Sequence, residues 1–199
     1  MQEMLKHAPF AVDGIEANTV EHTFVKQVLV PYREHCCYLQ SVVVQIDDSN
    51  SSEHPDVILH GEFTIPDSCY IDDTGHFNAV EFNICYNQIA YCYMAYTITN
   101  NLQPALANYD LAQFFEKQLS NFLITTTQAK YASSLNAKRF FGSFRITNAR
   151  ETRYGVRFDT EMAFRDDNAG RAQGEVVLAV LAPTPTVQAS NTTNKKVAS

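Results

Sequence analysis

The residues best suited to chemistry lie within one stretch, residues 64–91. Gly75 permits a tight turn, and the residues from Phe77 to Val80 should begin a helix. The first N–H groups of a helix have no partner within the helix and carry its positive dipole end, so they can stabilise a developing oxyanion. We therefore predict an oxyanion hole at the start of this helix, with His76 as a second-rank candidate for a base.

The polar residues of this stretch also have purely structural interpretations. Asn78, followed three residues later by Glu81, forms a pattern typical of a helix cap. Asn87 lies on a helix that is apolar nearly all round, where a buried amide can simply satisfy a neighbouring backbone group. A histidine beside a glycine turn is more often structural than catalytic. The residues alone leave both interpretations open, and Asn78 can cap and act chemically at once.

The composition indicates a soluble globular chain. Its 199 residues are 45% hydrophobic, and its net charge of -7 excludes a protein whose main role is to coat nucleic acid. The charge is uneven, because residues 1–129 hold 4 basic and 16 acidic side chains, whereas residues 130–199 hold 11 basic and 6 acidic ones. The basic part indicates either a site for phosphate or an acidic partner, or merely solvated strand faces.

Cysteine and histidine usage indicates no metal site and no disulfide framework. The five cysteines include one adjacent pair and no C-x-x-C motif, and the histidines lack metal-ligand spacing. A cysteine nucleophile would need a neighbouring base. We expect a reducing, cytoplasmic compartment, because the chain starts without a signal-peptide pattern. Residues 77–96 form the longest apolar stretch of the chain, but five of their side chains are polar. This favours a buried helix over a membrane span.

The first half of the chain is expected to contain a helix and two strands before residue 77. A helix over residues 18–29 would be capped by Asn18 and stopped by Pro31. Strands are predicted over residues 38–46 and 57–65, joined by a polar loop over residues 47–55. In the second strand, apolar side chains alternate with solvent-facing ones, which are His60, Glu62 and Thr64.

The remaining elements complete an α+β architecture. Helices are predicted over 77–96 and over 110–124, the second capped by Asp110 with its apolar side, including Leu119, facing inward. Strands are predicted over 140–146, 152–164 and 174–182, with a turn at 166–170. A curved antiparallel sheet wrapped around a long central helix, the hot-dog fold, fits this order, although periodicity leaves other α+β folds open. We expect an N-terminal arm (1–17), one domain (18–182) and a disordered tail (183–199).

Several motifs are specific enough to resemble a known family. They are Tyr70-Ile71, the run TGHFNAVE at 74–81 and the run YNQIAY at 86–91, with shorter matches at 31–32, 135–136 and 174–175. Together they resemble the FcoT family, that of the mycobacterial long-chain fatty acyl-CoA thioesterase. The similarity covers residues 20–182 and implies the hot-dog fold independently of the periodicity.

The resemblance also implies which residues act. The functional polar residues of the family correspond to Tyr32, Tyr70, Asn78 and Asn87. Tyrosine and asparagine can polarise a carbonyl or orient a water molecule, but neither is a strong base at neutral pH. The family lacks the carboxylate that many other hot-dog thioesterases use. The neighbouring carboxylates here are Glu81, kept as a second-rank candidate, and Asp72 and Asp73.

The resemblance leaves three functions open. The leading interpretation is hydrolysis of a fatty acyl thioester on coenzyme A or an acyl carrier protein. In the alternative, taken from FcoT-like proteins of isonitrile lipopeptide pathways, glycine adds to the double bond of a 2-enoyl carrier-protein thioester, and an arginine would bind the glycine carboxylate. The third is an acyl-binding module without chemistry. The missing carboxylate base makes the glycine reaction a serious competitor, because water needs activation more than an amine does.

The expected partners follow from these reactions. Gly75 and Phe77 would contact the substrate, and Lys138 and Arg139 would contact its phosphate or an acidic carrier protein. No cofactor is implied. Hot-dog proteins of this kind assemble into dimers or larger homo-oligomers that commonly build the site at the interface, so we expect at least a dimer.

Overall fold

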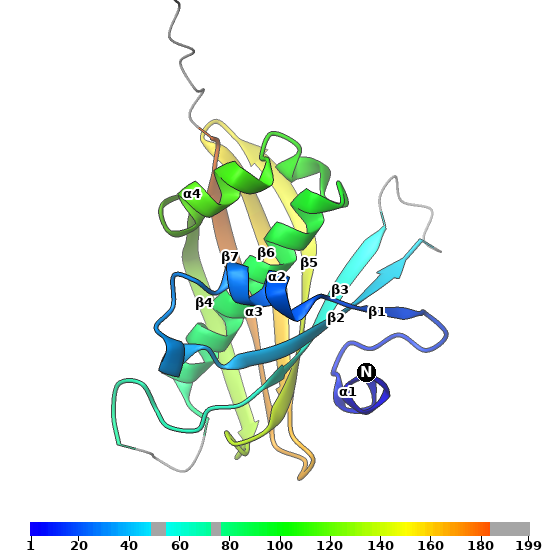
Figure 1. Cartoon of the computed structure of the whole chain (residues 1–199), viewed down its shortest axis with the longest axis vertical. Coiled ribbons are helices and arrows are strands. Elements are labelled where there is room, and N and C mark those ends of the chain that lie inside the picture. Colours follow the sequence, from blue (N-terminus) through cyan, green and yellow to red (C-terminus); the bar gives the residue numbers. More distant parts are fainter. Residues whose placement is uncertain (49–54, 73–76, 184–199) are drawn as a thin grey trace, which may run out of the picture.

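The computed structural model describes residues 1–48, 55–72 and 77–183. These residues form a seven-stranded antiparallel sheet, in the order β1-β2-β3-β5-β6-β7-β4, that curves around helix α3 (Figure 1). The strands are β1 (Ala17–Thr19), β2 (Leu39–Asp47), β3 (Asp56–Phe63), β4 (Phe122–Ser133), β5 (Phe140–Thr152), β6 (Gly155–Arg165) and β7 (Arg171–Leu181). The helices are α1 (Gln2–His7), α2 (His22–Val28), α3 (Ala79–Thr99) and α4 (Leu111–Asn121), with 3-10 turns η1 (Glu34–Cys36) and η2 (Pro104–Leu106). The predicted α+β hot-dog fold is confirmed.

Helix α3 forms the centre of the core and matches the helix predicted over 77–96. Asn78 caps it, because its side-chain oxygen accepts from the N–H groups of Val80 and Glu81 while Glu81 accepts from the Asn78 N–H. Apolar side chains on nearly every side of α3 are buried against the sheet, α2 and α4. This helix could form only inside the protein, because burial of those side chains supplies most of its stability.

An aromatic cluster holds the start of α3 against the sheet. The Phe77 ring lies 5.1 Å from the ring of Phe140 on β5 and 5.0 Å from that of Phe164 on β6. Phe82, one turn into the helix, lies 5.3 Å from Phe164. Tilted aromatic pairs at such distances each contribute about 1 kcal/mol beyond burial. The position of Asn78 is therefore set by packing on both sides of it in the chain.

The helix predicted over residues 18–29 is wrong at its start. Asn18 does not cap it but lies in β1, where its backbone pairs with that of Val44 in β2. The helix α2 begins at His22, and its N-cap Glu21 makes no side-chain capping bond. The capping pattern at Asn18 does not start a helix here, because pairing with β2 satisfies the hydrogen-bonding groups of this backbone segment.

The helix predicted over residues 110–124 is in fact a helix followed by a strand. Asp110 caps α4 as predicted, but the chain becomes extended at Phe122, which pairs with Val180 in β7. Leu119, expected to face inward, is 65% exposed. Most side chains of β4 are exposed because the strand lies at the edge of the sheet, so it lacks the apolar alternation that reveals a half-buried strand.

The strand predicted over residues 152–164 begins too early. The chain turns at residues 153 and 154, where the Thr152 hydroxyl donates to the carbonyl of Gly155, and β6 starts at Gly155. Gly155 has a φ of 143°, which an L side chain rarely adopts, so a hairpin forms where the alternation is uninterrupted. Within the predicted loop 47–55 and tail 183–199, residues 49–54 and 184–199 lie outside the described residues.

The expectation that His60 faces solvent is also wrong. Its ring is fully buried beneath the N-terminal segment, which crosses the face of the sheet opposite α3. His60 Nδ1 lies 2.8 Å from Ser143 Oγ, and Nε2 lies 3.0 Å from Gln45 Oε1. The neighbouring row of the same sheet face is covered by Met4 from α1. The alternation of apolar and polar residues could not reveal this second layer.

The protonation of His60 follows from its partners. Gln45 Nε2 donates to the carbonyls of Val12 and Ile15, so Gln45 Oε1 is the acceptor that faces the ring. His60 therefore donates from Nε2 and accepts at Nδ1 from the Ser143 hydroxyl. Burial lowers the pKa of His60 from 6.5 to about 4. The neutral ring thus fastens the N-terminal segment to the sheet.

We expect this ring to make stability fall with acid. As pH decreases from 6.5 to 4, the unfolded chain binds a proton at His60 that the folded chain does not, so the folded state loses about 3 kcal/mol of relative stability. The contribution is complete above pH 6.5. Urea unfolding of the wild type and of His60→Gln at pH 7.5 and 4.5 measures it. The variant should lose less stability between the two pH values, and equal losses would contradict the assignment.

Candidate active site

The structure brings two of the predicted site residues, Tyr70 and Asn78, into direct contact. The Tyr70 hydroxyl donates to Asn78 Oδ1 at 3.0 Å. The same oxygen accepts from the N–H groups of Val80 at 2.9 Å and Glu81 at 3.4 Å. Because all three partners are donors, they orient the amide with its oxygen toward the helix and its NH₂ group away from these donors.

This orientation leaves donors at the start of α3. Neither the Asn78 NH₂ group nor the Ala79 N–H has an acceptor among the described residues. Asn78 is half-buried and Ala79 exposed, so a carbonyl oxygen could approach both from solvent. A carbonyl placed there would meet two donors and the positive end of the helix dipole.

The oxyanion hole predicted from residues 77–80 therefore has fewer free backbone donors than expected. The Phe77 N–H donates to the carbonyl of Leu135 at 3.3 Å, and the Asn78 N–H donates to the Glu81 carboxylate at 3.0 Å. The Val80 N–H is already bonded to the Asn78 side chain. Among these backbone groups only the Ala79 N–H stays available within the described chain, because the cap and the loop consume the others.

Glu81 has a demonstrable structural role. It is buried, and its Oε2 accepts the Asn78 N–H to complete the capping box. The carboxylate is thus held 3.0 Å from the backbone nitrogen of Asn78. Phe77, predicted to contact substrate, is 4% exposed and belongs to the aromatic cluster. Gly75 and His76 lie outside the described residues.

Asn87 lies further along α3 than Asn78, and Tyr32, which is not part of this helix, packs beside Tyr91. Asn87 follows Asn78 by nine residues, which is about 13 Å along a helix. Its half-buried amide has no hydrogen-bond partner among the described residues. The Tyr32 ring lies 6.5 Å from the ring of Tyr91, and burial raises the pKa of Tyr32 well above its usual range, so the phenol is neutral.

A partly exposed stripe of α3 connects these two positions. Val80, Ile84, Asn87 and Tyr91 follow one another at helical spacing, and the first three are not fully buried. The stripe passes from the donors at Asn78 to the neutral phenol of Tyr32. The stripe could accommodate an extended ligand that lies along the helix, with its polar end at Asn78 and a largely apolar chain beyond it.

Sequence reasoning missed Gln88, which anchors the segment that follows Tyr32. Gln88 is fully buried, and its Oε1 accepts from the N–H groups of Tyr38 and Leu39, each at 2.9 Å. Its Nε2 donates to the carbonyl of Cys36 at 2.6 Å. One side chain therefore fixes the segment after Tyr32 against α3. A glutamine within an otherwise apolar helix was the available signal, since a buried amide requires partners.

The two residues predicted to contact phosphate are engaged elsewhere. The Arg139 guanidinium lies 2.8 Å from Glu62, 3.3 Å from Glu3 and 3.7 Å from Asp167. The first two carboxylates hold the pKa of Arg139 above its usual range. Lys138 Nζ donates to the carbonyl of Pro66 at 2.5 Å, at the start of the loop that carries Tyr70. Both residues thus hold the structure around the site together.

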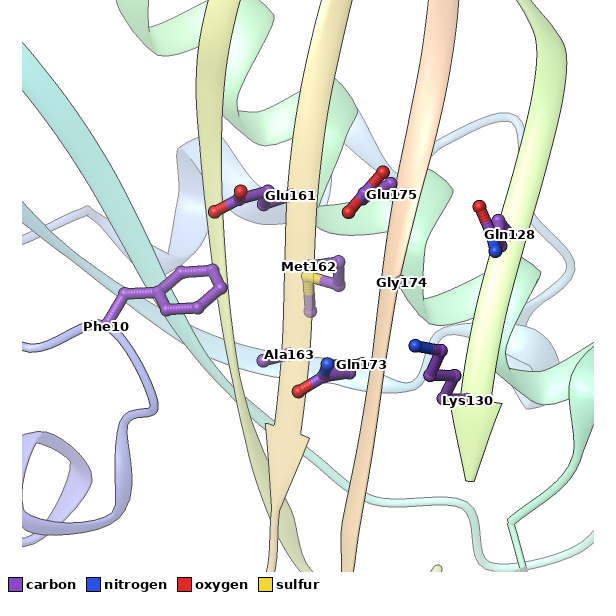
Figure 2. Close-up of a pocket in the computed structure, with 9 residues that line it drawn as sticks. All are labelled: Phe10, Gln128, Lys130, Glu161, Met162, Ala163, Gln173, Gly174 and Glu175. Atoms are coloured by element: carbon purple, nitrogen blue, oxygen red, sulfur yellow. The ribbon is translucent and has the colours of Figure 1, made fainter. Parts of the chain in front are cut away.

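A hollow on the sheet is not part of this site. It lies on the face opposite α3, between the N-terminal segment and the strands β6, β7 and β4 (Figure 2). Its lining residues are Phe10, Gln128, Lys130, Glu161, Met162, Ala163, Gln173, Gly174 and Glu175. The described residues contain no group of three or more His, Cys, Asp or Glu side chains that could bind a metal ion. None of the helices in the described ranges combines the length and apolarity that crossing a bilayer requires.

Comparison with known proteins identifies the family. Residues 27–180 match the family model described as an FcoT-like thioesterase domain. The chain belongs to the FcoT-like thioesterase family. The resemblance found in the motifs is thereby confirmed, and the protein is an enzyme of this hot-dog family.

Relatives in the FcoT-like family share most of the chain. A (2E)-enoyl-ACP glycyltransferase of Streptomyces coeruleorubidus is 38% identical over 164 residues, which cover 80% of this chain and 96% of the relative. One of Mycobacterium marinum is 31% identical over 183 residues, covering 90% and 96%. A Staphylococcus aureus protein solved in complex with CoA is 13% identical and covers 75% of this chain and 99% of its own, with a TM-score of 0.43. At that TM-score the similarity adds nothing to the fold described above.

Proposed function

We propose that this protein adds glycine to the double bond of a 2-enoyl thioester carried by an acyl carrier protein. The observation that carries the proposal is the pair of relatives, both (2E)-enoyl-ACP glycyltransferases, that are 38% and 31% identical over 96% of their own length. Hydrolysis, the leading interpretation from the sequence, becomes the second candidate, favoured by the description of the family model.

The geometry at the start of α3 supports this reaction. The glycine nitrogen, as the free amine, forms a bond to the β-carbon, and the π electrons of the double bond move to give an enolate. The Asn78 NH₂ group and the Ala79 N–H would stabilise the oxygen of that enolate. The α-carbon then gains a proton and the nitrogen loses one, so the adduct stays on its carrier.

The groups around Asn78 favour an amine over water as the nucleophile. The Glu81 carboxylate accepts a backbone N–H within the cap, and the Tyr70 hydroxyl donates to Asn78. These hydrogen bonds leave neither group as a free base that could deprotonate water. A neutral amine adds without such activation, whereas hydrolysis needs a base to deprotonate water. Tyr70 would act by holding the Asn78 amide in its orientation.

One assay separates the candidate reactions. The protein is incubated with a saturated and a 2-enoyl carrier-protein thioester, with and without glycine, and free thiol and adduct mass are followed. We expect a glycine adduct from the 2-enoyl substrate only. Thiol release from the saturated substrate would favour hydrolysis, and neither product would indicate an acyl-binding module. Asn78→Asp serves as the matched inactive control, since an aspartate caps the helix but lacks the NH₂ group.

We also propose that the protein forms at least a dimer, as other hot-dog proteins of this kind do. Light scattering should give at least twice the mass of one chain. A wild-type mass of one chain would contradict this assembly.

A further inference from the structure

Three basic side chains, none of which makes an ion pair within the described residues, form what we call the basic cluster: Lys130, Arg165 and Arg171. Arg165 on β6 lies directly opposite Arg171 on β7, and both are exposed. Lys130 on β4 lies opposite Gln173, one row further along the same face. None of the three pairs with a carboxylate of residues 1–48, 55–72 or 77–183. The cluster is therefore a local concentration of basic side chains without ion pairs in the described chain, although the carboxylate of Glu175 lines the same hollow as Lys130.

Other arginines of the sheet, in contrast, do form ion pairs with carboxylates. Arg145 lies 2.6 Å from Glu161, and Arg150 lies 2.8 Å from Asp159. Like charges directly opposite each other in an antiparallel pair destabilise the sheet. The pairing of Arg165 with Arg171 thus costs stability that a neutralising partner would restore. An anionic partner is the chemistry that fits.

The basic cluster lies at the same end of the sheet as the candidate site. The backbone at Gly170, in the turn between β6 and β7, packs against Leu135, whose carbonyl accepts the Phe77 N–H. Figure 1 shows this turn, the end of β4 and the start of α3 at one end of the molecule. Residues in this region therefore connect the outer face of the sheet with the donors at Asn78.

The edge strand β4 connects the two faces directly. Successive side chains of a strand point to opposite faces. Lys130 lies on the outer face, where it borders the hollow of Figure 2, whereas the Tyr131 ring lies 6.5 Å from Phe77 and 6.2 Å from Phe82. A ligand that holds Lys130 can therefore pass around this edge and reach the start of α3.

We propose that the basic cluster is the docking surface for the acyl carrier protein. This inference rests on the proposed function and names its partner surface. The bound partner would be an acidic protein that lies on the ends of β6, β7 and β4 and extends its acyl-bearing arm around β4 to Asn78. The chain carries a net charge of -7, so an acidic partner needs such a local basic surface. Asp67 and Asp72, exposed in the loop that carries Tyr70, would repel an acidic partner and help to set its orientation.

The test compares charge reversal at the basic cluster with reversal elsewhere. We expect Lys130→Glu, Arg165→Glu and Arg171→Glu combined to slow association with an acidic bacterial holo acyl carrier protein about tenfold and to reduce its salt dependence. KM for the carrier-bound 2-enoyl substrate should rise by a similar factor, with kcat unchanged. The same acyl chain on a short pantetheine analogue should react normally. Arg153→Glu, in the turn between β5 and β6 at the opposite end of these strands, is the matched control and should change none of these quantities.

The remaining outcomes overturn one proposal or the other. An equal loss of activity with the carrier-bound and the pantetheine substrates would show damage to the site. An equal rise in KM for acyl-CoA would show that the cluster recognises the phosphate groups of CoA. Either result overturns carrier docking. If the wild type converts neither substrate, the proposed function fails, while binding of a fluorescently labelled carrier protein still tests the surface. Replacing the three residues by Gln should weaken binding in the same direction but less, which controls for misfolding.

Discussion

Replacement of Asn78 by Ala should lower kcat/KM for the thioester substrate by a factor of about 10² to 10³, the effect typical of losing one oxyanion donor. The Asn78 amide is the side-chain donor whose orientation three hydrogen bonds determine, with Tyr70, Val80 and Glu81. The alanine variant also loses the helix cap, which should reduce the free energy of unfolding by about 1 kcal/mol. Steady-state kinetics and urea unfolding measure the two effects separately.

Asn78→Asp distinguishes chemistry from capping. The aspartate can still accept from the N–H groups of Val80 and Glu81, so its stability should lie within about 0.5 kcal/mol of the wild type. It has no NH₂ group and places a negative charge where an oxyanion develops, so activity should fall at least as far as in Asn78→Ala. An active Asn78→Asp enzyme would show that Asn78 only caps α3.

Gln88→Leu should reduce the free energy of unfolding by about 3 kcal/mol, because it leaves buried polar groups without partners. The N–H groups of Tyr38 and Leu39 and the carbonyl of Cys36 all bond to this one side chain. The leucine has a similar volume, so the loss would come from unsatisfied hydrogen bonds rather than from a cavity. Urea unfolding followed by circular dichroism measures it.

Gln40→Leu is the matched control for Gln88→Leu. The Gln40 amide donates to the carbonyls of Cys37 and Tyr38, in the same segment of chain, but it does so on the exposed surface. Water can replace those bonds, so we expect a change below about 0.5 kcal/mol. Similar losses in the two variants would mean that burial does not determine the contribution of Gln88.

Elements packed against the main core were predicted well, whereas an edge strand and a sheet face covered by a second layer were not. Helix α3 and strand β7 follow the predicted ranges because their apolar residues report directly on the core. Strand β4 was missed because an edge strand exposes most of its side chains. His60 was misplaced because the N-terminal segment covers a face that alternation marks as solvated. Periodicity reports burial by one layer only.

The sequence named candidate site residues but could not show which of them lie together. The motif pointed to Tyr70 and Asn78, which do meet. It also pointed to Asn87, which lies further along α3, and to Tyr32, which packs beside Tyr91 of that helix. The prediction that several N–H groups share an oxyanion was too broad, because Phe77, Asn78 and Val80 already donate to other groups. Such competition for donors is a property of three-dimensional contacts.

The sequence by itself determined the family, the central helix and the capping residue at its start. Those features are local: a motif of adjacent residues, an apolar run of helical length and an Asn–Glu pair. Only the tertiary structure decided that the Arg139 charge is neutralised by Glu3, Glu62 and Asp167. The same holds for Arg165 and Arg171, which face each other without an ion pair in the part of the chain that the structure describes. Charge counts along the chain cannot show this, because an ion pair depends on distance in the folded protein rather than on separation in sequence.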